Sequence, residues 1–167
     1  MVPEVKTILF VTELSRNSRH AFYYAASLAS IYRAKIDILC PMEDIQGSMK
    51  NYIFGMLGDE LYHKYEDKKA DHARSVLIGK EKDSHTVQSA LEILRDDSIE
   101  KLREDKRLVN QMIIKNKETD ITEEIHSQCQ KEKYDIIVAS YTCFTELHDL
   151  RAGSKIKKTL KSNKIPL

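Results

Sequence analysis

The sequence lacks tryptophan and has only three cysteines, none of which forms a CxxC pair. Three cysteines at positions 40, 129 and 143 argue against a disulfide scaffold and against a cysteine zinc site. No apolar run approaches the roughly 20 residues that a membrane-spanning helix needs. The first apolar run, residues 8–11, is too short for the core of a secretory signal. We therefore expect a cytoplasmic protein without a membrane partner.

The sequence also lacks an excess of charge of one sign. Its 27 Lys and Arg residues nearly balance its 26 Asp and Glu residues, so the chain as a whole does not attract nucleic acid. Its six histidines show neither HxxxH nor HExxH spacing, and we expect no metal site. No nucleophile elbow, P-loop or catalytic carboxylate pair is visible. These absences predict a protein that is not an enzyme.

What the chain does have is the alternation of strands and helices that an α/β domain needs. Its 167 residues are enough for one domain, spanning 1–167. Short β-branched or apolar runs predict four strands, at residues 6–12, 35–40, 108–115 and 134–139. Between the first two strands, Ser15 and Ser18 supply helix-capping side chains. The helix that follows is expected to pack on the sheet through Ala21, Tyr24, Ala25, Leu28, Ala29 and Tyr32.

The middle of the chain, residues 44–106, predicts a long helical region that resembles an insertion. Gly55 and Gly58 interrupt the first of its two helical patterns. We interpret the apolar stripes as core faces, not as cofactor contacts. The first stripe comprises Met49, Ile53, Met56, Leu57, Leu61 and Tyr65, and the second comprises Val87, Leu91, Leu94, Ile99 and Leu102.

Two further helices complete the predicted order. Residues 120–123 resemble a capping box at the start of a short helix, and residues 154–160 predict the start of a last helix. The order β-α-β, long helical region, β-α-β, α predicts an α/β fold with an open parallel sheet of four or five strands flanked by helices. In such Rossmann-like sheets, ligands bind beyond the carboxyl ends of the strands.

Segments at both ends of the chain form a recognisable pattern. They are residues 8–15, the helix with Ala21 and Ala25, residues 34–39, residues 135–139, and the pair Gly153 and Ser154. In these segments the chain resembles universal stress proteins. The resemblance implies the strand order 3-2-1-4-5 and the function of a regulatory or interaction module in the stress response.

Members of this family that bind ATP have a loop of the form G-x2-G-x9-G-[ST] after the fourth strand. In this sequence the first two glycine places fall on Ser140 and Cys143, and only Gly153 and Ser154 match the pattern. The glycines allow backbone N–H groups to approach phosphate oxygens, which a β-carbon obstructs. The resemblance therefore implies a degenerate nucleotide site.

Two more positions depart from the family pattern. The acidic residue that the family places towards the nucleotide, usually Asp, falls on Glu13, whose side chain is one methylene longer. The position whose backbone pairs with adenine falls on Pro41, which has no N–H to donate. We expect weak or absent ATP binding and no cofactor. The alternative is an ATP-binding switch in which Glu13, Gly153 and Ser154 still hold the polyphosphate. A third class is a nucleotide-dependent transferase, which we expect least because the sequence places no residue to act as a nucleophile or to accept a proton.

The start of the predicted last helix is the best candidate for binding an anion. Gly153, Ser154 and Lys155 combine unpaired N–H groups, a hydroxyl and a nearby ammonium at the positive end of a helix dipole. The alternative reading is a helix N-terminus that Ser154 caps by itself, and that reading remains open.

The last residues bear on assembly. In the family, a fifth strand opened by a proline pairs with its counterpart in a second subunit, and residues 165–167 supply only its beginning. Without that strand, residues 134–139 form an open apolar edge, which invites pairing or needs a cover. We expect a homodimer whose interface differs from the fifth-strand contact. A different protein is the alternative partner.

Overall fold

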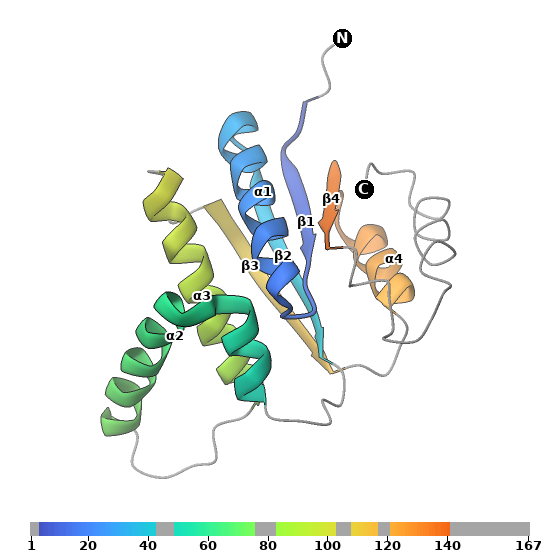
Figure 1. The fold of residues 1–167 in the computed structure, drawn as a ribbon. Helices are drawn as coiled ribbons and strands as arrows, with labels where there is room; N and C mark the ends of the chain where they lie inside the picture. The colour runs from blue at the N-terminus through green and yellow to red at the C-terminus, as the bar shows by residue number, and fades with distance from the viewer. Residues whose placement is uncertain (1–3, 43–48, 76–82, 103–107, 117–120, 141–167) are drawn as a thin grey trace.

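The computed structural model describes residues 4–42, 49–75, 83–102, 108–116 and 121–140 (Figure 1). All four predicted strands are present in this part of the chain, whereas the predicted helix at 154–160 lies outside it. The elements are β1 (Thr7–Val11), α1 (Arg16–Tyr32), β2 (Lys35–Met42), α2 (Met49–Ser75), α3 (Asp83–Leu102), β3 (Val109–Asn116), α4 (Ile121–Lys131) and β4 (Ile136–Ala139).

The four strands form one parallel sheet in the order β3-β2-β1-β4. This confirms the predicted α/β class and the first four places of the predicted order; a fifth strand falls outside the described residues. Val11 is in register with Leu39 of β2 and with Ala139 of β4. The carboxyl ends of β1, β2 and β4 therefore lie at one edge of the sheet.

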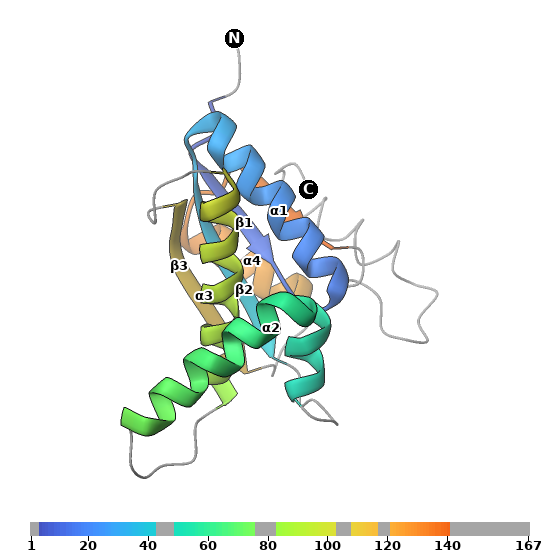
Figure 2. The same cartoon turned by 60° about the vertical axis from the view of Figure 1, so that its left-hand side comes forward.

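Both faces of β1 are buried, as its unbroken apolar run predicts. Ile8 and Phe10 point into a large core that includes side chains of α1, α2 and α3, whereas Leu9 and Val11 point into a smaller core with Ile121 of α4. Three helices thus cover one face of the sheet and α4 covers the other, as the two views show (Figures 1 and 2).

Helix α1 meets the sheet through its smallest side chains. Ala25, Ala26 and Ala29 are fully buried, and the ring of Phe22 packs edge-on against that of Phe10 at 5.1 Å between centroids. The expectation that Tyr24 and Tyr32 pack on the sheet is wrong, since they are 73% and 45% exposed. Alanine allows the helix to approach the strands closely, and two tyrosines in the same contact would hold it away.

The stripes of the middle region are core faces, as predicted. Helix α2 is bent at Gly58, whose φ of 70° and ψ of 175° are not helical. There the Arg19 guanidinium of α1 donates a hydrogen bond of 2.7 Å to the carbonyl of Leu57, one of the carbonyls that a helix end leaves without a partner. The side chains buried on α2 and α3 include Ile53, Met56, Leu57, Leu61, Tyr65, Val87, Leu91 and Leu94.

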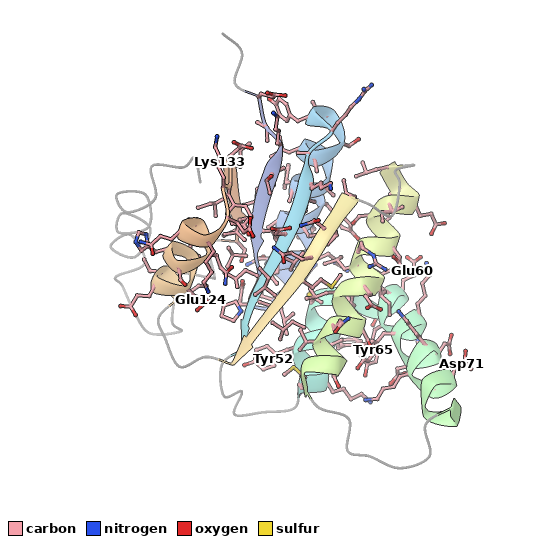
Figure 3. The ribbon with its side chains drawn as sticks, turned by 180° about the vertical axis from the view of Figure 1, so that it is seen from behind. Tyr52, Glu60, Tyr65, Asp71, Glu124 and Lys133 are labelled. Atoms are coloured by element: carbon pink, nitrogen blue, oxygen red, sulfur yellow. The ribbon has the colours of Figure 1, made fainter. Side chains whose placement is uncertain are left out.

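The outer part of α2 and the opposite helix α4 mark two sides of the molecule. Seen from behind, Glu60, Tyr65 and Asp71 on α2 lie on one side of the sheet and Glu124 on α4 lies on the other (Figure 3).

None of the helices in the described part of the chain combines the length and the apolar composition that a membrane span requires.

A buried carboxylate connects the strands on the α4 side. Asp37 of β2 is only 2% exposed and accepts hydrogen bonds from Asn110 at 3.0 Å and Gln111 at 2.7 Å, both on β3. It also accepts one of 2.9 Å from the hydroxyl of Tyr134, which precedes β4. Because all three donors reach one acid, its burial is compensated within the fold.

Candidate functional site

β1 and β4 are neighbouring strands of the sheet, and the chain connections on their two sides run in opposite directions along the sheet. The helix that follows β1, α1, covers one face, and the helix that precedes β4, α4, covers the other. Open α/β sheets bind their ligands at such a switch point, beyond the carboxyl ends of the strands. Glu13 follows β1 by two residues and Ser140 follows β4 directly, so the structure brings these two predicted site residues to the switch point.

Glu13 and Ser140 are in direct contact. The Ser140 hydroxyl lies 2.8 Å from Oε1 and 3.0 Å from Oε2 of Glu13, and its single proton can be shared between the two oxygens. Ser140 is 6% exposed, and Glu13 is half-buried. The two residues that the resemblance assigns to the first glycine place and to the acidic place are thus bonded to each other.

Two serines of α1 hold the same carboxylate. Ser15 is the N-cap of α1: its side chain accepts from the N–H of Ser18 and donates to Oε1 of Glu13. The hydroxyl of Ser18 donates to Oε2 at 3.0 Å. Sequence reasoning identified these serines only as helix caps; the E-x-S-x-x-S spacing after a strand is the signal that could have indicated their second role.

The carboxylate therefore lies beside the N-terminus of α1 with three hydroxyl donors. This end of a helix carries a partial positive charge and favours an anion. In this chain the carboxylate of Glu13 occupies the place at the start of α1 where a bound anion would lie.

A strained residue shapes the loop between β1 and α1. Leu14 has a φ of 64°, in the left-handed region that branched side chains rarely adopt, and its N–H donates to Oγ1 of Thr12 at 3.1 Å. Such backbone strain costs on the order of 1–3 kcal/mol. The leucine side chain is 2% exposed within the large core, and this burial offsets the strain.

The thiols of Cys40 in β2 and Cys129 in α4 are unreactive at neutral pH. Burial, and to a lesser degree the nearby charge of Glu13, raises the pKa of Cys40 to about 12, and burial raises the pKa of Cys129 to about 11. Both thiols are therefore protonated at neutral pH. The thiolate is the reactive form, so neither side chain is an activated nucleophile.

Pro41 lies in β2 beyond the reach of β1. The last pair of β1 and β2 is Val11 with Leu39, whereas Pro41 is in register with Lys115 of β3. At this point β3 is the strand that pairs with β2 among the described residues, and a strand without a second neighbour tolerates the missing N–H of proline. Pro41 therefore offers no N–H donor near the carboxyl end of β2.

The other predicted site residues, Cys143, Gly153, Ser154 and Lys155, lie outside the described residues. So does Asp120, the predicted cap of α4. Within the part of the chain that the structure describes, no group of three or more His, Cys, Asp or Glu side chains could hold a metal ion.

Comparison with known proteins bears on the fold. No protein-family model matches the sequence, and no curated protein matches it either. Among solved structures, universal stress protein UspA from Lactobacillus plantarum matches with a TM-score of 0.56 and 16% identity, covering 98% of this chain and 96% of that chain. A universal stress protein in complex with cAMP matches with a TM-score of 0.54 and 12% identity, covering 98% and 95%.

The chain has the universal stress protein fold. The resemblance based on residues 8–15 and 135–139 is thereby confirmed for the fold. In this universal stress protein fold, Glu13 and Ser140 mark the ends of the two strands that flank the switch point.

Proposed function

We propose that this chain is a regulatory or interaction module of the universal stress protein type that acts in the stress response without binding ATP tightly. The observation that carries the proposal is the contact of the Ser140 hydroxyl with both carboxylate oxygens of Glu13. The proposal also includes that the chain is not an enzyme; raised pKa values make Cys40 and Cys129 poor nucleophiles, which removes two candidates for a catalytic thiol.

The first support is the occupied carboxylate. A ligand that used Glu13 would have to replace hydrogen bonds from Ser15, Ser18 and Ser140, or leave these hydroxyls without their partner. A hydrogen bond to a charged group contributes about 1.5–3 kcal/mol. Replacing even one of them weakens a ligand by about tenfold or more.

The second support is charge. A phosphate group that approached the N-terminus of α1 would meet the carboxylate of Glu13, which already lies there. Two unit charges of the same sign repel by about 4 kcal/mol at a separation of about 4 Å when the effective dielectric constant is about 20. The site therefore disfavours a polyphosphate without a bound cation. Because Mg²⁺ can offset this repulsion, the hydrogen bonds that already occupy Glu13 remain the main argument against binding of Mg-ATP.

Calorimetry with Mg-ATP tests the proposal on the purified protein. We expect a dissociation constant weaker than about 10 µM, and we expect Ser140→Gly to strengthen binding because it removes both the β-carbon and the hydroxyl. Ser27→Ala is the matched control, since the Ser27 hydroxyl only bonds the carbonyl of Tyr23 within α1. Binding at a few micromolar or tighter by the unsubstituted chain would contradict the proposal.

The alternative function is a nucleotide-binding switch. One solved structure with this fold is described as a complex with cAMP, whose single phosphodiester needs fewer phosphate contacts than the triphosphate of ATP. Titration with cAMP under the same conditions distinguishes the two functions. Binding of cAMP that Glu13→Gln abolishes would favour the switch.

A further inference from the structure

The outward side of α1 carries apolar and basic side chains that the packing of the domain does not use. Tyr24 is 73% exposed and Ile31 is 74% exposed, the two highest values among the large exposed hydrophobic residues in the described part of the chain. They lie seven residues apart and so share one side of the helix with Arg16 and His20, which are also exposed. We call these four residues the outer stripe of α1.

The other described elements leave this stripe uncovered. The buried side of α1 consists of Ser18, Phe22, Ala25, Ala26 and Ala29, which face the sheet. In Figures 1 and 2, α2 and α3 lie beside and below α1, and no described helix crosses its outward side. Because the two apolar side chains share one side of the helix, a partner that packs along that side covers both at once.

The charge of the helix indicates what kind of partner fits. No Asp or Glu occurs between residues 14 and 34, whereas this segment contains Arg16, Arg19, His20 and Arg33. Arg19 is engaged with the carbonyl of Leu57, but Arg16 and Arg33 are exposed at the two ends of the helix. A complementary partner is apolar at its centre and acidic at its ends.

We propose that the outer stripe of α1 binds an acidic amphipathic helix of another protein. Tyr24 and Ile31 are the apolar anchors, two turns apart on one side of α1, so that a second helix packed along α1 can cover both, and Arg16 and Arg33 pair with carboxylates at either end. The inference rests on the interaction role proposed above and is independent of whether ATP binds.

Binding is measured by the fluorescence anisotropy of a labelled synthetic peptide. The peptide is a helix of about four turns with leucines at i, i+3, i+4 and i+7 and glutamates on its other side. A second peptide has lysines in place of the glutamates. We expect the acidic peptide to bind about tenfold tighter or better, with a preference that weakens at high salt.

Substitutions locate the surface. Tyr24→Ala and Ile31→Ala are each expected to weaken the acidic peptide by about tenfold, and Arg16→Gln is expected to reduce the salt dependence. The matched control is Tyr32→Ala, which removes a 45% exposed tyrosine from α1 outside the outer stripe and should leave binding unchanged. Alanine favours a helix at these exposed positions, and a thermal melt followed by circular dichroism confirms that the variants fold.

Five results would overturn the inference. The first two are equal affinity for the two peptides and no binding of the acidic peptide. The third is binding to phosphatidylserine vesicles that Tyr24→Ala abolishes, and the fourth is a dimer that Tyr24→Ala dissociates; these would assign the outer stripe to a membrane or to a second copy of the chain. The fifth is peptide binding that persists in Tyr24→Ala and Ile31→Ala, which excludes this surface but keeps the interaction role. Tight ATP binding refutes only the ATP part of the proposed function.

Discussion

Glu13 and Ser140 are 127 positions apart in the sequence, yet the Ser140 hydroxyl lies within 3.0 Å of both oxygens of the Glu13 carboxylate. Both residues differ from the ATP-binding pattern that the resemblance implies, which has a shorter acid in place of Glu13 and a glycine in place of Ser140. The longer carboxylate and the added hydroxyl bind each other.

The first prediction concerns the stability of this contact. Ser140→Ala should lower the free energy of unfolding by about 1–2 kcal/mol, because the carboxylate loses one of its three hydroxyl donors. Urea unfolding measures the change. Glu13→Gln combined with Ser140→Ala should cost less than the sum of the two single changes, and additive effects would contradict a direct interaction.

The second prediction uses the two glycines of α2. Gly58→Ala should destabilise the fold by about 1–2 kcal/mol, because a left-handed φ of 70° disfavours a β-carbon. That carbon would also lie 2.5 Å from Nη1 of Arg19 and disturb its bond to Leu57. Gly55→Ala is the matched control, since a β-carbon there meets nothing within 4 Å. It should stabilise the helix by about 0.5–1 kcal/mol, and equal effects of the two substitutions would contradict the bend.

The third prediction is a dependence of stability on alkaline pH. Burial, followed by the charge of Glu13, raises the pKa of Cys40 from 9.0 to about 12, so the fold favours the neutral thiol. The stability that this provides is fully present below the unfolded pKa and is lost as the pH rises from about 9 towards about 12. The slope for this one group is about 1.4 kcal/mol per pH unit.

Cys40→Ala removes this titration. We expect the variant to be less stable near neutral pH, because a buried sulfur is lost, and to show a shallower decline in the free energy of unfolding above about pH 9. Urea unfolding of both proteins at a series of alkaline pH values gives the two slopes. Parallel slopes would show that Cys40 does not titrate as described.

The fourth prediction concerns assembly. β4 pairs with β1, and no strand among the described residues pairs with its other edge. Tyr52 and Phe54 of α2 are 42% and 44% exposed. We predict a homodimer that uses α2 and not a fifth strand, and light scattering at several concentrations should give twice the monomer mass.

The double variant with Tyr52→Ala and Phe54→Ala should be a monomer. A monomer mass of the unsubstituted chain throughout the micromolar range would refute the dimer. A dimer that survives in the double variant would refute the α2 interface alone.

The sequence predicted the sheet well because its signal is local. Residues 6–12 form a short apolar run, and the structure buries both faces of that strand. The side of α1 that meets the sheet was harder to predict. Its alanines and its tyrosines both recur at helical spacing, and only the close approach to the sheet selects Ala25 and Ala29 over Tyr24.

The candidate site was predictable in its position but not in its bonds. The order of strands placed Glu13 and Ser140 at one edge, whereas the E-x-S-x-x-S spacing only indicates that the hydroxyls of Ser15 and Ser18 can reach the carboxylate and does not specify that they turn towards it. Those bonds depend on the left-handed turn at Leu14, and a leucine gives no sign of such a conformation.

The central place of β1 in the sheet has a consequence for the order in which the chain assembles during synthesis. A ribosome that has released residues 1–116 has supplied β1, β2 and β3, which can already pair, but one side of β1 still lacks its neighbour. Only when residues 135–140 emerge can Asp135 bind the backbone N–H groups of Lys6 and Thr7, and only then does Ser140 reach Glu13. The earliest strand of the chain is thus completed by the latest one described, and the polar contact at the switch point forms with that final step.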